Sequence, residues 1–320
     1  MTVSRVLNGK GSIRPATRQK VLEAIARLGY RPSRVARSLT TRTSYTLGMV
    51  LPDIGNPFFP EIVAGVEQAA WQAGYSLMLC NSSEDPERER QALERLEDAH
   101  VDGVVLCSSR QEPELLYRYL QGPAPLVLVN RYLTAPRVAS ILVDDAYGTM
   151  CAVHHLFRTG HSAIAFVAGP EHSHSGQERR RGFVTAFETS GRMLSEDCIV
   201  ACQPQEQAGY DSSKALLSAD PKLTALLCYN DLVAIGALQA AQELGKRVPE
   251  DVAIIGCDNI RMASLTHPPL TTLEVDKAAL GQQALQLLLE LIQGKPPRHV
   301  RLKPQLIVRQ SAPFNLCALA

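Results

Sequence analysis

Polar side chains that could bind a small molecule stand directly after three apolar, strand-like segments. They are Asn130 after residues 126–129, Asn230 after residues 225–229, and Asp258 after residues 254–257. These segments lack the polar alternation of half-exposed strands, which is typical of strands buried on both faces. In open α/β sheets, ligands bind beyond the carboxyl ends of the strands. We therefore expect these three side chains to line a ligand site.

Patterns for metal binding, phosphate binding and acyl transfer are weak in this chain. His172 and His174 stand two residues apart, but no cysteine or acidic ligand accompanies them at a set spacing. The glycines at 9 and 11 lack the rest of a phosphate-binding loop, and no Gly-x-Ser-x-Gly segment occurs. We expect no metal, no cofactor and no enzymatic activity.

The elements that must position the polar side chains alternate between apolar runs and segments of helical period. Residues 47–51 have a buried-strand pattern, and the following segment is apolar at 62, 63, 66, 69 and 70, which is helical spacing. Repetition of this pair predicts parallel strands joined by helical crossovers. About ten strands are too many for one small sheet. We therefore expect an α/β protein with two Rossmann-like lobes, dividing near residues 144–148.

Charge is distributed unevenly along a chain of 320 residues whose formal net charge is only +1. Residues 1–44 contain ten basic residues and one acid, a net charge of +9, whereas the remaining 276 residues carry 23 basic and 31 acidic groups, a net charge of −8. This asymmetry favours a polyanion-binding N-terminal piece joined to a mildly acidic body.

Several global features favour a cytoplasmic protein. No uncharged apolar run reaches the ~18 residues that span a bilayer, and the N-terminus lacks the apolar core of a secretory signal. The eight cysteines are scattered and form no Cys-x-x-Cys pair. We expect them to be buried, reduced thiols.

The basic N-terminal segment predicts short helices. Residues 2–8 form a brief helical piece that ends at the glycines of 9–11, and residues 15–28 form a longer helix with Pro15 in its first turn and Gly29 at its end. Residues 34–39 are short, basic and poor in apolar groups, so this third helix would need a partner to form in water.

Motifs along the whole chain resemble the LacI/GalR family of bacterial transcription regulators. At the N-terminus they are Thr2-Val3-Ser4-Arg5-Val6-Leu7-Asn8-Gly9, Leu28-Gly29-Tyr30-Arg31-Pro32-Ser33 and Val35-Ala36-Arg37-Ser38-Leu39. In the body they include Asn56-Pro57-Phe58-Phe59, Val101-Asp102-Gly103, Gly169-Pro170, Arg179-Arg180-Arg181-Gly182-Phe183, Asn230-Asp231, Gly256-Cys257-Asp258-Asn259 and Pro268-Pro269-Leu270-Thr271-Thr272. Each motif is weak alone, but their common order makes coincidence implausible.

The resemblance implies a small all-α DNA-binding headpiece and hinge helix, followed by a core like that of periplasmic sugar-binding proteins. We expect the headpiece and hinge in residues 1–44. The N-terminal core lobe would comprise 45–147 plus 276–303, and the C-terminal core lobe 148–275 plus 304–320. The family has a further helix and turn before the segment that matches Thr2, whereas this sequence starts at Met1. In the family, that helix braces the recognition helix, which enters the major groove of DNA. We therefore expect weak or absent specific operator binding for the chain as written.

The same resemblance implies which residues contact DNA. Thr2, Ser4 and Arg5 fall on the recognition helix, and the forked guanidinium of Arg5 can bind guanine O6 and N7. As alternatives, Arg5 contacts a phosphate and Ser4 caps the helix. Leu39 matches a leucine that wedges into a minor-groove base step, with packing on its own core as the alternative. Ser33 and Ala36 would lie against the groove walls.

Effector residues are also implied by family matching. Arg179, Asn230 and Asp258 would contact the ligand, with Phe58 and Phe59 on the opposite lobe and Asn130 and Ser175 assisting; further candidates are Tyr210 and Ser108. Carboxylate, amide and guanidinium groups suit adjacent hydroxyls, and an aromatic ring stacks on a sugar face. Alternatively, Asp258 caps a helix, Arg179 serves a structural salt bridge, and one phenylalanine belongs to the core.

The sequence therefore predicts a ligand-responsive transcriptional regulator, a repressor that acts as a cytoplasmic homodimer. Its partners would be operator DNA and a small-molecule effector, a sugar or sugar derivative, with no membrane association. The alternative is a periplasmic-type sugar-binding protein without DNA function. That alternative would need an export signal and would leave residues 2–39 unexplained.

Overall fold

The structure is a computed structural model that describes residues 6, 14–28, 43–119, 122 and 124–314. It divides into two units, residues 1–45 and residues 46–320. In the first unit, α2 (Pro15–Leu28) covers the residues predicted for the longer N-terminal helix, and this prediction is confirmed. None of the α2 residues is buried, whereas Val6 is.

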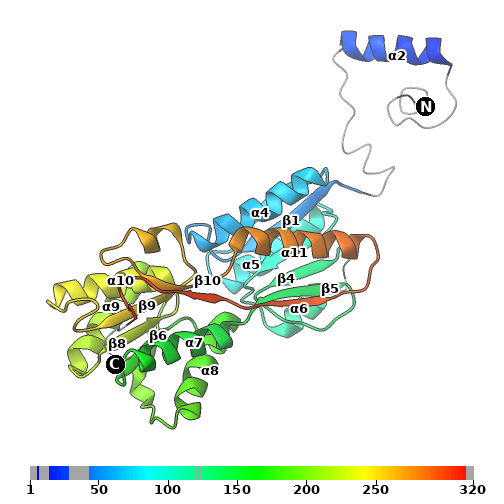
Figure 1. The fold of residues 1–320 in the computed structure, drawn as a ribbon. Coiled ribbons are helices and arrows are strands. Elements are labelled where there is room, and N and C mark those ends of the chain that lie inside the picture. Colours follow the sequence, from blue (N-terminus) through cyan, green and yellow to red (C-terminus); the bar gives the residue numbers. More distant parts are fainter. Residues whose placement is uncertain (1–5, 7–13, 29–42, 120–121, 123, 315–320) are drawn as a thin grey trace. The chain divides into compact units, whose positions relative to one another are not determined.

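The second unit contains two lobes (Figure 1). Each lobe is built on a six-stranded sheet. The sheet of the N-terminal lobe has the order β11-β5-β4-β3-β1-β2, and every pair is parallel. Its strands are β1 (Thr46–Leu51), β2 (Ser76–Asn81), β3 (Val104–Cys107), β4 (Leu126–Val129), β5 (Val138–Val143) and β11 (His299–Leu302). Its helices are α4 (Phe58–Gln72), α5 (Pro86–Asp98), α6 (Pro113–Tyr119) and α11 (Lys277–Ile292).

The sheet of the C-terminal lobe has the order β12-β10-β9-β8-β6-β7, and only the β10–β12 pair is antiparallel among its described strands. Its strands are β6 (Ile164–Ala168), β7 (Ile199–Ala201), β8 (Ala225–Cys228), β9 (Ala253–Cys257), β10 (Thr271–Glu274) and β12 (Gln305–Ile307). Its helices are α7 (Asp145–Arg158), α8 (His174–Thr189), α9 (Glu206–Ala219) and α10 (Asp231–Glu243), with 3-10 turns η1 (Glu196–Cys198) and η2 (Arg261–Ser264). Two parallel α/β lobes confirm the predicted fold class.

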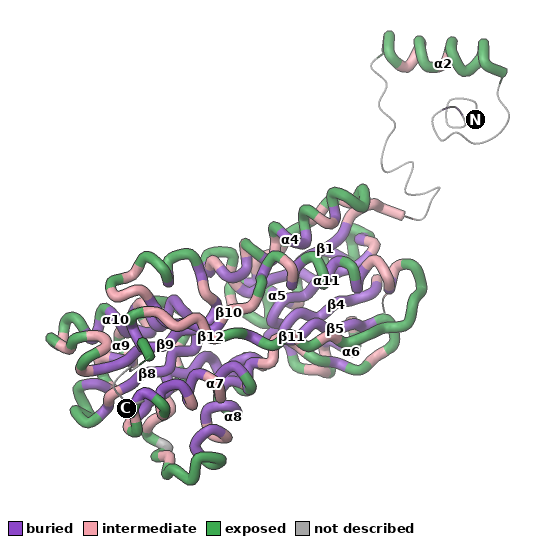
Figure 2. The backbone as a smooth tube through the Cα atoms, in the orientation of Figure 1, coloured by how far each residue is buried: buried purple, intermediate pink, exposed green. Residues whose placement is uncertain are grey.

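Helices cover both faces of each sheet, so the central strands are buried on both sides. In the N-terminal lobe, α4 and α11 pack on one face of β1, β3, β4 and β5, while α5 and α6 pack on the other. In the C-terminal lobe, α9 and α10 cover one face, and α7 and α8 cover the other. Figure 2 shows the buried strands between the more exposed helices. This layering explains why the apolar runs of the sequence show no polar alternation.

The chain passes between the lobes three times. It leaves the N-terminal lobe after β5, returns after β10 to form α11 and β11, and crosses again to add β12 to the C-terminal lobe. The strands β10, β11 and β12 were not predicted from the sequence, since they are short and are not continuous apolar runs. The crossings place the carboxyl ends of the strands of both lobes around one cleft.

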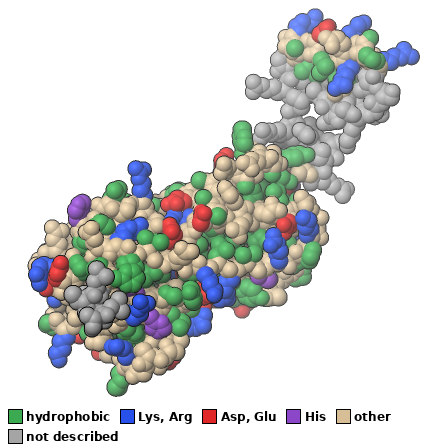
Figure 3. All heavy atoms as spheres, viewed as in Figure 1, with side chains coloured by type: hydrophobic (Ala, Val, Ile, Leu, Met, Phe, Trp, Pro, Cys, Tyr) green, Lys and Arg blue, Asp and Glu red, His purple; other side chains and the backbone are tan. Residues whose placement is uncertain are grey.

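Three further features concern the described core. Among the described residues, no helix is both long enough and apolar enough to cross a membrane. The seven described cysteines are free, but only Cys107, Cys228 and Cys257 are buried, so the expectation that all the thiols are buried was wrong. On the face shown in Figure 3, acidic and basic side chains are interspersed over the core unit.

Candidate ligand-binding cleft

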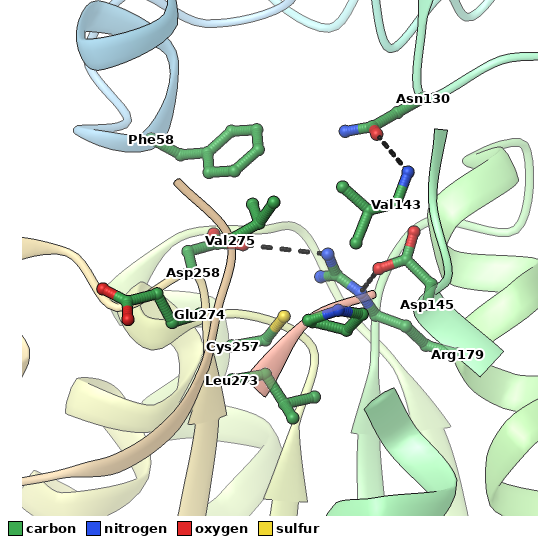
Figure 4. A pocket seen from close by; sticks show the side chains of 11 residues that line it. Phe58, Asn130, Val143, Asp145, Arg179, Cys257, Asp258, Leu273, Glu274 and Val275 are labelled. Atoms are coloured by element: carbon green, nitrogen blue, oxygen red, sulfur yellow. Dashed lines mark hydrogen bonds and ion pairs between the residues drawn. The ribbon is translucent and has the colours of Figure 1, made fainter. Parts of the chain in front are cut away.

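Two adjoining pockets form the cleft between the lobes, and the seven residues predicted for effector binding all line it. Phe58, Asn130, Arg179 and Asp258 line both pockets, and Phe59, Ser175 and Asn230 line one of them. Figure 4 shows that the side chains of Phe58 and Asn130 approach the cleft from one side and those of Arg179 and Asp258 from the other. Residues separated by two hundred positions in sequence are therefore brought together.

Arg179, a residue of α8, is the centre of a buried ion-pair network. Its Nε donates to Asp145 Oδ1 at 2.8 Å, its Nη2 lies 3.7 Å from Asp258 Oδ1, and its Nη1 donates to the Tyr229 carbonyl. The guanidinium carbon also lies 4.8 Å from the centroid of the Tyr229 ring. Burial lowers the pKa of Arg179, but Asp145 and Asp258 more than offset this, so the pKa lies well above its ordinary value. Arg179 therefore faces the cleft as a fixed cation.

Asp258 follows β9 in a backbone conformation that is unusual for a residue with a side chain. Its φ is +113°, outside the regions that L-residues ordinarily occupy. Strain of this kind persists only where surrounding contacts enforce it, and it is concentrated at functional sites. Burial raises the pKa of Asp258 to about 6, and Arg179 and Lys277 limit the rise. The N-cap position of η2 is Ile260, so Asp258 does not cap this turn.

The amide and hydroxyl groups of the cleft differ in how far the protein already uses them. Asn130 Oδ1 accepts from Val143 N at 3.3 Å. Asn230 Oδ1 caps α10 by accepting from Val233 N at 2.9 Å. Ser175 is buried, and its Oγ has no hydrogen-bond partner among the described residues. Since buried polar atoms are rarely left unpaired, the Ser175 hydroxyl is the group most available to a ligand.

Phe58 and Phe59 begin α4 on the N-terminal side of the cleft. The two rings meet edge to face, with centroids 5.2 Å apart and an interplanar angle of 84°. Asn56 Oδ1 accepts from Phe58 N at 3.0 Å and fixes the start of this segment. Both phenylalanines are buried and also belong to the apolar core beneath α4 and α11. Both phenylalanines therefore pack in the apolar core and also line the cleft.

A second buried arginine, Arg110, lines the cleft from the N-terminal lobe and was not predicted. Its Nε and Nη2 bind the two carboxylate oxygens of Glu84 at 2.6 and 3.1 Å, and its Nη1 donates to the Ser108 carbonyl at 2.9 Å. Arg110 N also donates to Glu89 Oε2 at 2.8 Å. These contacts hold the turn after β3 against the loop after β2.

Other cleft residues were also missed, although their positions followed the rule applied to Asn130. Asp145, Tyr229 and Arg110 come just after β5, β8 and β3, where polar groups were expected. Close packing fixes Tyr229, because a Cβ at Gly169 would lie 2.4 Å from its ring, and its hydroxyl lies 3.0 Å from Ser173 Oγ. The strand-end rule would therefore have found Asp145 and Arg110, whereas Tyr229 was assigned to the strand itself, which ends at Cys228.

The structure separates the two further candidates. Ser108 lines the cleft, but Tyr210 does not line either cleft pocket. The Tyr210 hydroxyl binds Glu243 and accepts from Lys214 Nζ at 3.0 Å, which joins α9 to α10. Among the described residues, no group of three or more His, Cys, Asp or Glu could hold a metal ion.

The residues implied to contact DNA lie outside the described residues. They are Thr2, Ser4, Arg5, Ser33, Ala36 and Leu39.

Comparisons with known proteins cover both parts of the chain. Residues 44–310 match a family described as periplasmic binding proteins and sugar binding domain of LacI family, and residues 1–33 match bacterial regulatory proteins of the lacI family. The HTH-type transcriptional repressor PurR of Mannheimia succiniciproducens is 35% identical over 317 residues, which cover 97% of this chain and 94% of the relative. The ribose operon repressor of Halalkalibacterium halodurans is 37% identical over 315 residues, with coverage of 97% and 92%.

Two solved structures extend these similarities. The lac repressor dimer bound to operator and the anti-inducer ONPF is 27% identical, with a TM-score of 0.86 and coverage of 98% of this chain and 94% of that one. The transcriptional regulator CelR in complex with cellobiose is 30% identical, with a TM-score of 0.78 and coverage of 96% and 94%. The chain therefore belongs to the LacI family of bacterial regulatory proteins and is a ligand-responsive, DNA-binding transcriptional regulator.

Proposed function

We propose that this regulator is a repressor whose cleft binds an uncharged carbohydrate and couples its binding to that of operator DNA. Arg179 and Asp258 bind adjacent hydroxyls, and Ser175, Asn130 and Asn230 supply further hydrogen bonds. Phe58 and Phe59 pack against the apolar face of the ring. The observation that carries the proposal is the Arg179–Asp258 pair. It places a buried hydrogen-bond donor and a buried acceptor at the same cleft, with Arg179 Nη2 3.7 Å from Asp258 Oδ1.

The charges of the cleft support a neutral ligand. Arg110 is paired with Glu84, and Arg179 is paired with Asp145, so neither guanidinium is free to neutralise an anionic ligand. Asp258 adds a further negative charge, since its pKa of about 6 leaves it mainly ionised at pH 7. A phosphate or carboxylate in the cleft would meet this negative charge in a buried environment, where like charges repel strongly.

Relatives support a small, hydroxyl-rich effector. The relatives named above include a ribose operon repressor, and a cellobiose complex is among the similar structures.

We assign the DNA contacts to residues 1–44, with Thr2, Ser4, Arg5, Ser33, Ala36 and Leu39 at the duplex, and propose a homodimer that reads a pseudo-palindromic operator. Linkage makes the coupling reciprocal, so the carbohydrate changes operator affinity by the factor by which DNA changes carbohydrate affinity.

The remaining assignments follow from this role. We propose a headpiece and hinge in residues 1–44, an N-terminal lobe of 45–147 plus 276–303, and a C-terminal lobe of 148–275 plus 304–320. The membership of α11 and β11 in the first lobe and of β12 in the second supports this division. A cytoplasmic location, the lack of any enzymatic activity and the lack of a metal or cofactor belong to the same proposal.

A thermal-shift panel of matched ligands tests the function. It pairs D-glucose with D-glucuronate, D-galactose with D-galacturonate, and D-ribose with D-ribose 5-phosphate, and adds cellobiose and inosine. We expect at least one neutral sugar to raise the melting temperature and its anionic counterpart not to do so. The shift should disappear in Arg179→Ala and Asp258→Ala. A shift by inosine alone, or an undiminished sugar shift in both variants, would contradict the proposal.

A further inference from the structure

Lys277 stands where a lysine is disfavoured for two reasons. It is the first residue of α11, where the positive end of the helix dipole repels a cation. It is also only 4% exposed, and burying an ammonium group is costly unless oxygen atoms replace the lost water. Local preferences therefore do not explain this residue, and its contacts must.

Those contacts lie on the strained loop that carries Asp258. Lys277 Nζ donates to the carbonyl of Asp258 at 2.8 Å and to the carbonyl of Asn259 at 3.1 Å. Both of these residues have positive φ, at +113° and +46°. Two consecutive carbonyls that point at one ammonium group are the contacts that can hold such a backbone in place.

The third contact of Lys277 is in the N-terminal lobe. Its Nζ lies 3.6 Å from Glu61 Oε2, in the first turn of α4, the helix that begins with Phe58 and Phe59. Helices α4 and α11 lie side by side in Figure 1. A Cβ at Gly65 would lie 2.2 Å from Ala278 O, and one at Gly281 would lie 2.2 Å from Ile62 O. The backbones of α4 and α11 are therefore in direct contact.

We propose that Lys277 is a positioning residue that holds the Asp258 loop in its ligand-binding conformation and links it to α4 of the opposite lobe. This inference rests on the proposed role of Asp258 in ligand binding. The link runs from the loop through Lys277 to the α4–α11 pair. Residue 45 ends the N-terminal unit and β1 then leads into α4, so α4 lies close in sequence to the junction with that unit.

A double-mutant cycle distinguishes positioning from general stabilisation. Lys277→Met keeps the length of the side chain and removes its charge, and Lys277→Arg restores a donor cation. Lys295→Met is the matched control, because this lysine is exposed just beyond the other end of α11. Affinity is measured by calorimetry for the neutral sugar of the panel that gives the largest thermal shift.

We expect Lys277→Met to weaken sugar binding at least tenfold, Lys277→Arg to recover most of this loss, and Lys295→Met to have no effect. In the cycle with Asp258→Asn, the double variant should bind hardly more weakly than the weaker single variant, since Lys277 acts through Asp258. If the affinity losses of the two single variants multiply in the double variant, the inference is wrong. It is also wrong if Lys277→Met binds the sugar as tightly as the wild type. Neither result would contradict the carbohydrate proposal.

Hydrogen–deuterium exchange tests the link without depending on ligand identity. In the ligand-free protein, Lys277→Met should speed exchange in a peptide covering residues 258–262 at least tenfold, and Lys295→Met should leave it unchanged. Glu61→Gln keeps the loop contacts, so exchange at 258–262 should stay slow while sugar-induced protection at 58–66 is lost. Unchanged exchange in Lys277→Met would overturn the inference, whereas failure of every sugar in the panel would overturn only the carbohydrate proposal.

Discussion

The two lobes contribute different chemistry to the same cleft. The N-terminal lobe supplies the Phe58–Phe59 pair and an arginine, Arg110, whose side chain is clamped by Glu84. The C-terminal lobe supplies Arg179, shared between two carboxylates, and Ser175, whose hydroxyl has no partner in the described part of the chain. The C-terminal lobe thus holds most of the groups that can still form hydrogen bonds, whereas the N-terminal lobe offers aromatic surface, a clamped arginine and the Asn130 amide. We infer that ligand identity is read mainly by the C-terminal lobe.

The largest expected effect comes from removing the cation of the C-terminal lobe. Arg179→Met leaves Asp145 and Asp258 buried without their partner, so we expect the free energy of unfolding to fall by about 3–5 kcal/mol and sugar binding to be lost. Urea unfolding and calorimetry measure the two effects. Arg181→Met, which removes an exposed partner of Glu178, should change neither appreciably. Retained binding in Arg179→Met would break the comparison between the lobes.

The next effect is a pH dependence that originates at Asp258. Protonation as the pH falls through about 6 removes the carboxylate, so sugar affinity should fall about tenfold between pH 7 and pH 5. The free energy of unfolding should change in the opposite direction. Because the pKa of Asp258 in the folded protein lies above the ordinary value of about 4, the folded form binds more protons than the unfolded form between pH 6 and pH 4. The contribution of Asp258 to stability therefore rises as the pH falls through this range. Calorimetry across this range checks both signs, and Asp258→Asn should flatten both.

A smaller effect is expected in the N-terminal lobe. Glu84→Gln leaves the charge of Arg110 unpaired, so the preference for D-glucose over D-glucuronate should fall several-fold, up to about tenfold. Competition binding with the two ligands gives this ratio. The same substitution at Glu87, which binds Arg90 on the exposed face of α5, is the control. An unchanged ratio would mean that Arg110 does not influence ligand charge.

The smallest effect concerns the unpaired hydroxyl. Ser175→Ala should weaken sugar binding by about 0.5–1.5 kcal/mol, while the melting temperature of the free protein stays the same or rises slightly. Ser173→Ala is the matched control, since Ser173 Oγ accepts from Gly176 N and contacts the Tyr229 hydroxyl. That variant should lower the melting temperature. The reverse pattern would show that Ser175 is structural.

The sequence predicted the strands before Asn130, Asn230 and Asp258 because continuous apolar runs between helical segments have few other interpretations. It did not predict β10, since this strand begins with two threonines. Their burial depends on distant partners: Thr272 Oγ1 donates to Asp231 at 2.6 Å, and Thr271 Oγ1 accepts from Arg309 N at 2.8 Å. Local polarity cannot reveal such compensation.

The site shows the same limit. Residues at strand ends could be predicted individually because topology alone brings them to one edge. The Arg110–Glu84 clamp could not, because it requires the loops after β2 and β3 to meet across 26 positions of sequence. The buried position of Lys277 was likewise hidden, since a lysine at the start of a helix is ordinarily an exposed one.

The threefold passage of the chain between the lobes has a consequence for its synthesis. Helix α11 covers part of the apolar face of β3, β4 and β5, yet it begins only at residue 277. As the chain leaves the ribosome, N-terminal segments ordinarily fold first. Here α4 can cover part of this face early, but the part under α11 stays open until nearly the whole chain has emerged, whereas β6 to β10 arise from one continuous stretch. The lobe that begins later in the sequence can therefore complete most of its core earlier.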